Sequence, residues 1–427
     1  FHDQRVRDIQ RQVHVWRKEG GKTLMCTGRP VWLTVSLRGG KYKKTNKNIM
    51  INMMDILDVD TQRQVVRVEP LVNIGQITAL LNSLGRTLPV LPELDDLTVG
   101  GLVMGTGIES SSHIYGLFQH ICVAFELVLA DGSLVRCTEV RGLLPWSCGT
   151  LGFLVAAEIK IVPARYWIRR QYEPIRGLEN ICRRFSEASE DKNNTFVEGL
   201  QYSLDKVVIM TGTMTDGERE RERNRGRMIS LHYKPWFFKH VERYLTENNT
   251  AVEYIPLRHY YHRHTQSIFW ELQVHTYTHI HTHTHNKITF YLSHAPNTQH
   301  HVVQDMLVPM KHIQTAIARF HQDIHVYPLW LCPFVLPLAR GMVHPKGEEA
   351  ELYVDIGVYG EPRVKHFIFV CVCVCVCVCV FQMLYADEYM ERSEFWVKFV
   401  GMLKSPELGC RDAFPEVYDK ICKAARL

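Results

Sequence analysis

The first twenty residues carry a pattern of hydrophobic and polar positions that is typical of an amphipathic helix. Val6, Ile9, Val13 and Trp16 recur at intervals of three or four residues, and mostly charged or polar side chains lie between them. This spacing places the four side chains on one face of an α-helix. The pattern stops at two consecutive glycines, so it predicts a helix over residues 5–20 with one buried face.

Shorter hydrophobic patterns predict small β-units around one further helix. The helix is predicted over residues 74–84, where the spacing is helical up to Gly85. Strands at 48–53 and 64–68 are expected to pair as a hairpin through the turn-rich segment 58–61. Further short strands are predicted at 23–27, 33–37, 125–129 and 133–137, and the last two flank an Asp-Gly turn. Together these elements predict an α+β fold class.

The chain from about Tyr166 onward has the pattern of a second α+β domain. Strands are predicted at 196–202, 207–212, 325–333 and 351–359, and a helix at 312–320. We therefore predict two domains, 1–165 and 166–427. Aromatic residues are dense at 233–238 and 260–270, where they could line an apolar pocket or form ordinary core.

Composition narrows the class of protein. A net charge of +5 is small for 427 residues and gives no indication of a nucleic-acid partner. The thirteen cysteines include five in one alternating run and no CxxC pair, which favours a reduced, cytosol-facing compartment. The chain opens on Phe1 with charged residues in place of an apolar leader, so we expect a fragment that lacks an N-terminal segment.

Residues 91–112 contain the strongest candidate for binding chemistry. Four glycines there, together with threonines and serines, could bring backbone N–H and side-chain hydroxyl donors close to an anion. The spacing resembles a Rossmann fingerprint, but we reject that assignment because no strand precedes the glycines and a serine replaces the third glycine. A surface turn without a ligand remains the structural alternative.

Several longer motifs resemble one family of flavoproteins. They are ELDDLTVGG at 93–101, MGTGIESSS at 104–112, CGTLG at 148–152, YIPLRHYYHRH at 254–264 and DAFPEVYDKICKAA at 412–425. This combination resembles the PCMH-type FAD-binding domain of the vanillyl-alcohol oxidase and p-cresol methylhydroxylase superfamily, and within it the Δ24-sterol reductases. The resemblance implies a two-subdomain FAD-binding PCMH-type domain followed by an α+β substrate (cap) domain.

The resemblance also implies the cofactors and most of the site. It predicts an FAD-dependent, NADPH-using reductase of the side-chain C24=C25 double bond of sterols, at the endoplasmic reticulum membrane and facing the cytosol, with membrane association through a missing N-terminal segment. Non-covalent FAD is expected because the loop from Thr27 to Trp32 contains no histidine. The predicted cofactor-binding residues are Thr27, Gly28, Thr98, Val99, Gly100, Gly101, Leu102, Val103, Met104, Gly105, Thr106, Gly107, Ile108, Glu109, Ser110, Gly149, Thr150 and Gly152.

The proton donor of such a reaction is not identified by the sequence. His325 and Tyr327 lie in the predicted cap domain, but their positions relative to a substrate do not follow from the pattern. Three histidines at 259, 262 and 264, beside Arg258 and Arg263, could hold an anionic cofactor, although a structural or surface role is the preferred interpretation.

Three segments depart from the family pattern in the same way. Each alternates two residues: Glu-Arg at 218–223, His-Thr at 279–285 and Cys-Val at 371–380. Dinucleotide repeats give these alternations on translation, so we interpret the surrounding segments 217–227, 274–298 and 368–380 as translated intron or a faulty gene model. The histidines could alternatively bind a metal from one face of a strand, but no metal is predicted. The apolar stretch 367–380 is too short to span a bilayer.

Residues 138–145 are a further departure, because a longer acidic helix precedes the 149–152 loop in the family. Two other classes of function stay open on this evidence. One is a different flavin-dependent dehydrogenase or oxidase of the same fold, and the other is a defective, non-catalytic product of a mis-spliced gene.

Overall fold

The computed structural model describes residues 1–30, 41–138, 144–217, 229–271, 302–338, 345, 347–362, 381–385, 391–398 and 413–422. The three repeats of two residues, the predicted strand at 33–37 and most of segment 138–145 lie outside the described residues. Within the described ranges, no helix combines the length and the apolar composition that crossing a bilayer requires.

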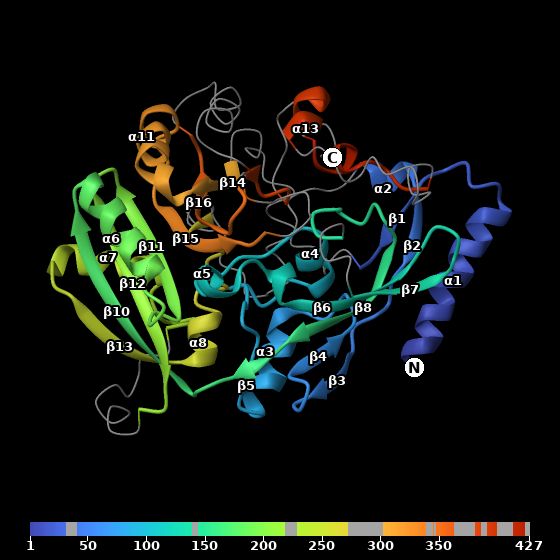
Figure 1. Ribbon diagram of the computed structural model, residues 1–427, viewed down its shortest axis with the longest axis horizontal. Coiled ribbons are helices and arrows are strands. Elements are labelled where there is room, and N and C mark those ends of the chain that lie inside the picture. The colour runs from blue at the N-terminus through green and yellow to red at the C-terminus, as the bar shows by residue number, and fades with distance from the viewer. Residues whose placement is uncertain are drawn as a thin grey trace.

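The α+β class is confirmed, and two large antiparallel sheets dominate the described residues (Figure 1). The first has the strand order β3-β4-β8-β6-β7. Its strands are β3 (Ile56–Asp60), β4 (Val65–Val68), β6 (Cys122–Val128), β7 (Leu134–Cys137) and β8 (Phe153–Lys160). Two small pairs accompany it: β1 (Met25–Gly28) with β2 (Lys47–Met50), which is parallel, and β5 (Arg86–Thr87) with β9 (Val162–Pro163).

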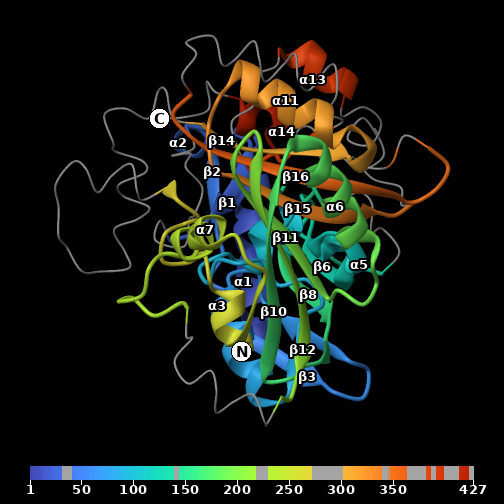
Figure 2. The same cartoon turned by 90° about the vertical axis from the view of Figure 1, so that its left-hand side faces the viewer.

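The second sheet has the order β13-β10-β12-β11-β15-β16-β14-β17. Its strands are β10 (Trp167–Arg176), β11 (Phe196–Ser203), β12 (Lys206–Thr215), β13 (Ala251–Pro256), β14 (Val302–Pro309), β15 (Leu329–Leu336), β16 (Glu351–Gly360) and β17 (Phe381–Gln382). Helices α6 (Leu178–Glu190) and α11 (Ile313–Asp323) pack together beside this sheet (Figure 2). An apolar core lies beneath them, formed by residues such as Phe185, Ile317 and Ile356.

The remaining helices are short apart from the first. They are α1 (His2–Lys18), α2 (Tyr42–Thr45), α3 (Ile74–Ser83), α4 (Val99–Met104), α5 (Ser112–Tyr115), α7 (Phe237–Glu247), α8 (Leu257–Tyr261), α13 (Arg392–Lys398) and α14 (Val417–Ile421), with 3₁₀ turns η2 (Phe118–Ile121) and η4 (Met310–His312). Helix α5 packs on β15, so it lies at the junction of the two large sheets (Figure 1).

The helix predicted at the N-terminus is confirmed as α1. Its apolar residues Val6, Ile9, Val13 and Trp16 are all buried. They pack in one core with strand residues and with Phe414 from far along the chain. Helix α3 is also confirmed, and a reciprocal capping box between Asn73 and Gln76 fixes its start.

One predicted hairpin is wrong in its partner. Strand β4 pairs with β3, which occupies the segment that was expected to be the turn, whereas β2 pairs with β1. The hydrophobic residues at 48–53 belong to a strand whose parallel partner lies more than twenty residues earlier in the chain. Local hydrophobic spacing does not identify such a distant partner strand. The hairpin of β6 and β7 is confirmed, and Asp131 accepts hydrogen bonds from the backbone and hydroxyl of Ser133 in its turn.

Candidate functional site

The glycine-rich segment is not the open loop that its composition suggests. Residues 99–104 form the short helix α4, and Thr98 accepts a hydrogen bond from Gly101 N as its N-cap. Gly100 and Gly107 are required by packing: an added Cβ would lie 3.0 Å from Pro70 at the first position and 2.7 Å from Leu102 at the second. The assignment of residues 98–110 to cofactor contacts stays a prediction, and in this structure several of these positions also serve packing and capping.

Burial divides this segment into two parts. Val99, Leu102, Val103 and residues 107–110 are buried in the protein. Gly101 is exposed, and Gly100 and residues 104–106 are partly exposed, so these positions are the ones that a bound molecule could reach.

Three predicted cofactor-binding segments come together beside this accessible part. Cys148 N donates to Met104 O at 3.1 Å, which ties the 149–152 loop to the end of α4. A Cβ on Gly149 would lie 3.9 Å from Thr27 Oγ1. Thr150 Oγ1 is buried with no hydrogen-bond partner among the described residues, which leaves a donor for a ligand. Segments more than 120 residues apart thus form one corner of the molecule.

Three cations that the sequence reasoning missed point to an anion at this corner. Lys420 Nζ, from α14, donates to the backbone oxygens of Cys148 and Gly149 at 3.0 and 3.2 Å. Arg29 follows β1, and Lys43 lies on α2. Burial, with repulsion from Arg29, lowers the pKa of Lys43 to about 8. Burial lowers the pKa of Lys420 to about 8 as well, and Lys43 adds to that effect.

Within the described part of the chain, no carboxylate contributes to the electrostatics of these three cations. Partly buried positive charges without counter-ions are costly, and a bound diphosphate would relieve that cost. Arg29 lies in the loop 27–32 and Lys420 in the motif at 412–425. Both residues therefore lie within the segments that resemble the family, but the resemblance did not indicate a role for either.

A second charge network, with equal numbers of arginines and glutamates, joins the 98–110 segment to the eight-stranded sheet. Arg263 Nη2 donates to Glu109 Oε1 and to Glu198 Oε2, both at 2.8 Å, and all three side chains are fully buried. Arg170 pairs with Glu198, and its Nη1 donates to Tyr260 OH at 2.9 Å. Burial disfavours the Glu198 carboxylate, but Arg263 and Arg170 outweigh this and hold its pKa well below the usual range.

Two histidines of the 254–264 motif, His262 and His264, are buried. His264 is buried and packs on Phe269, and burial lowers its pKa to about 4. His262 pairs with Asp95. Tyr260 bonds Ser110 Oγ at 2.7 Å, and Val197 N donates to Ser110 O. The motif therefore holds the end of the 98–110 segment against the sheet.

The aromatic residues at 260–270 are core, since Tyr260, Tyr261, Phe269 and Trp270 are all buried. His325 and Tyr327 precede β15 and form a cluster with His321, in which Tyr327 OH lies 3.1 Å from His321 Nδ1. No described contact connects this cluster to the 98–110 segment.

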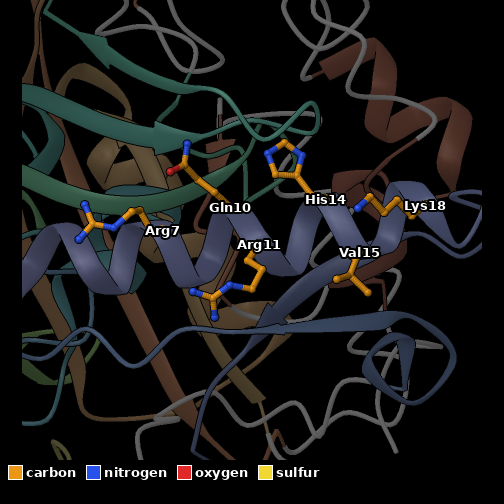
Figure 3. Close-up of a pocket in the computed structure, with 6 residues that line it drawn as sticks. All are labelled: Arg7, Gln10, Arg11, His14, Val15 and Lys18. Carbon is orange, nitrogen blue, oxygen red and sulfur yellow. The ribbon is translucent and has the colours of Figure 1, made fainter.

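A surface pocket lies along α1, lined by Arg7, Gln10, Arg11, His14, Val15 and Lys18 (Figure 3). None of the predicted cofactor-binding residues lines it. Across the described ranges, no group of three or more His, Cys, Asp or Glu side chains is placed to hold a metal ion.

Comparisons with known proteins identify an FAD binding domain and a family for this chain. Residues 30–138 match the family model described as FAD binding domain. The whole chain is 62% identical to the Delta(24)-sterol reductase of Homo sapiens, of which it covers 87%. It is 38% identical to the Delta(24)-sterol reductase homolog dhcr-24 of Caenorhabditis elegans and 35% identical to the Delta(24)-sterol reductase of Pisum sativum, covering 88% and 85% of those proteins and matching over its full length. The chain belongs to the Delta(24)-sterol reductase family and carries an FAD binding domain.

Proposed function

We propose that this chain is an FAD-dependent reductase that uses NADPH to saturate the side-chain C24=C25 double bond of a sterol, as in the conversion of desmosterol to cholesterol. The observation that carries the proposal is the convergence of Thr27, Met104, Gly149 and Lys420 at a corner with uncompensated positive charge. The relatives' names supply the substrate and the reaction.

The residues present fit FAD chemically. The negatively charged diphosphate of FAD would act as the counter-ion of Arg29, Lys43 and Lys420. The Thr150 hydroxyl can donate a hydrogen bond to an oxygen of the same molecule. FAD supplies hydride transfer when bound. Residues 27–32 contain no histidine, so we propose that the cofactor is held without a covalent bond.

The chain's own residues orient the site in this proposal. The Glu109–Arg263–Glu198 bridge fixes the far end of the 98–110 segment against the eight-stranded sheet. Arg170 also pairs with Glu198, so two guanidinium groups balance two carboxylates, which allows the network to be rigid without a ligand. The sheet then forms the wall against which a sterol would lie, which matches the proposed cap domain from residue 166 onward.

A test in three steps separates the alternatives. The purified full-length chain is reconstituted with FAD, and we expect a flavin absorbance spectrum whose chromophore is released by denaturation. Anaerobic NADPH should bleach the bound flavin, and desmosterol should restore its absorbance while gaining two hydrogens. Reduction by a hydroxy acid or lactone and rapid reoxidation by O₂, with no response to NADPH, would instead indicate a different flavoenzyme of this fold.

We also propose that the protein acts at the endoplasmic reticulum membrane on its cytosolic side. The support is its family membership together with the chemistry of a sterol substrate, which resides in membranes. Imaging of the tagged protein in cells, followed by protease digestion of sealed microsomes, tests this location. A tag that survives digestion would contradict the cytosolic orientation.

A further inference from the structure

The face of the eight-stranded sheet that carries Glu198 also carries carboxyl groups outside the arginine network. Asp355 on β16 pairs in register with Leu307, and Asp305 on β14 pairs with Gly357, so the two aspartates lie on one face two positions apart. Glu93, from the first part of the chain, is also buried. Burial raises the pKa of the Asp355 carboxyl well above its usual value, and repulsion from Asp305 and Glu93 adds to that effect.

Counting charges shows that these three carboxyl groups lack counter-ions. The buried cations of this region that the structure describes, Arg170 and Arg263, already neutralise Glu198 and Glu109. Burial raises the pKa of Asp305 to about 6 and, with repulsion from Glu109, raises that of Glu93 to about 8. Near neutral pH this cluster therefore holds protons that ordinary surface carboxylates would have lost.

Asp305 and Asp355 differ in how they are held. Asp305 accepts hydrogen bonds from Tyr359 OH and Tyr385 OH, each at 2.5 Å. Gly357 makes room for the first bond, because a Cβ there would lie 2.6 Å from Tyr359 OH. The Asp355 carboxyl is fully buried, and neither of its oxygens has a hydrogen-bond partner among the described residues. Burying a carboxyl group without hydrogen-bond partners costs folding free energy, so its presence here needs an explanation.

Asp355 also lies close to the segment proposed to hold the flavin. Cys332 on β15 is its direct cross-strand neighbour. Burial, with added effects of Glu109 and Asp355, raises the pKa of the Cys332 thiol well above its usual value. Glu109 belongs to the 98–110 segment, so the Cys332 thiol lies within electrostatic range of both that segment and Asp355. The unpartnered acid therefore lies on the sheet face that the Glu109–Arg263–Glu198 contacts join to that segment.

We propose that Asp355 is the catalytic acid of the reduction, an assignment that rests on the proposed function. One alkene carbon receives hydride from the reduced cofactor. The Asp355 O–H bond breaks, and its proton forms a C–H bond at the other carbon, so that two hydrogens are added and the alkene is saturated. The resulting carboxylate regains a proton from solvent before the next turnover.

The test compares Asp355→Asn with wild type and with Asp205→Asn, which alters an exposed turn between β11 and β12. We expect Asp355→Asn to bind FAD and to be reduced by NADPH at the wild-type rate. Its reoxidation by desmosterol should be about 100-fold slower or more, the range for loss of general acid catalysis. Asp355→Glu, which keeps an acid, should recover part of the rate, and Asp205→Asn should match wild type.

A second readout does not depend on turnover. The apoprotein at neutral pH should show the infrared carbonyl band of a protonated carboxylic acid, and part of this band should vanish in Asp355→Asn but persist in Asp205→Asn. The groups that face Asp355 and share its titration are Asp305, Glu93, Cys332, Tyr359 and Tyr385.

The outcomes separate this assignment from the proposed function. Reoxidation of Asp355→Asn at the wild-type rate would overturn the assignment alone. Loss of FAD from both Asp355→Asn and Asp355→Glu would assign the residue a structural role and overturn it as well. A wild-type protein that binds FAD but is never reoxidised by the sterol would overturn the proposed function and this step with it.

Discussion

Arg263 shows how a single residue can connect distant parts of this chain. Its guanidinium reaches Glu109 and Glu198, which lie 154 and 65 residues away in sequence. The pattern at 254–264 indicated a basic cluster and favoured a structural or surface role for its histidines, and His264 is fully buried in the structure. The pairing itself could not be predicted, because each acid lies on a separate element that packs against Arg263 only in the folded protein.

Replacing Arg263 by alanine should destabilise the protein by about 3–5 kcal/mol, because it leaves buried carboxylates without a counter-ion. Urea unfolding followed by tryptophan fluorescence measures the change. The control is Arg183→Ala, which removes an exposed pair with Glu187 on α6 and should cost only about 0.3–0.5 kcal/mol. Equal costs for the two variants would contradict the importance of burial.

At the scale of elements, strong local periodicity was a reliable guide. Helices α1 and α3 and the hairpin of β6 and β7 lie where hydrophobic spacing, caps and turn residues agree. Helix α4 was missed because two glycines hid it, and its start is set by Thr98 capping and by contact with Pro70. The pairing of β1 with β2 was missed because parallel partners are far apart in sequence.

Helix α1 offers a matched pair of substitutions for testing its packing. Val13 is fully buried, whereas Val15, on the same helix, is 42% exposed. Val13→Ala should lower the free energy of unfolding by about 1–3 kcal/mol through lost contacts and a small cavity. Val15→Ala should change it by less than about 0.5 kcal/mol. Thermal denaturation monitored by circular dichroism distinguishes the two, and similar losses would argue that α1 is not docked.

At the scale of the whole molecule, the candidate cofactor corner is assembled from five separated segments. The resemblance named three of them, at 27–30, 98–110 and 149–152, and their assignment to FAD contacts stays a prediction. Their closeness could not be derived from the sequence, because it depends on how β1, α4 and the 149–152 loop pack. The proposed division of the chain at residue 165 likewise stays a prediction.

Cofactor affinity should depend on pH through two lysines of this corner. In the apoprotein, burial lowers the pKa of Lys43 and of Lys420 to about 8, and a bound anion would raise both. FAD binding therefore takes up protons only at pH values where Lys43 and Lys420 of the apoprotein are partly deprotonated. The FAD dissociation constant should stay nearly constant below about pH 8 and increase as the pH rises above it. Fluorescence titration with FAD measures this profile.

Lys420→Met should weaken FAD binding at pH 7 by about 10- to 100-fold, the equivalent of one charge-assisted contact, and should flatten the pH profile. Lys420→Arg keeps the charge and should lose less affinity. Lys44→Met, which alters an exposed neighbour of Lys43 on α2, should bind as wild type does. An unchanged dissociation constant for Lys420→Met would remove Lys420 from the site.

The return of residues 413–422 to the first part of the chain has a consequence for biogenesis. Met25 N donates to Ala413 O at 2.7 Å, the rings of Phe153 and Phe414 pack edge to face, and Lys420 bonds the 149–152 loop. During synthesis, the ribosome releases residues 1–165 long before residue 420 has been made. Flavin loading on the nascent chain would therefore meet a corner without one of its three cations, and full retention of the cofactor would begin only after nearly the whole chain has been translated.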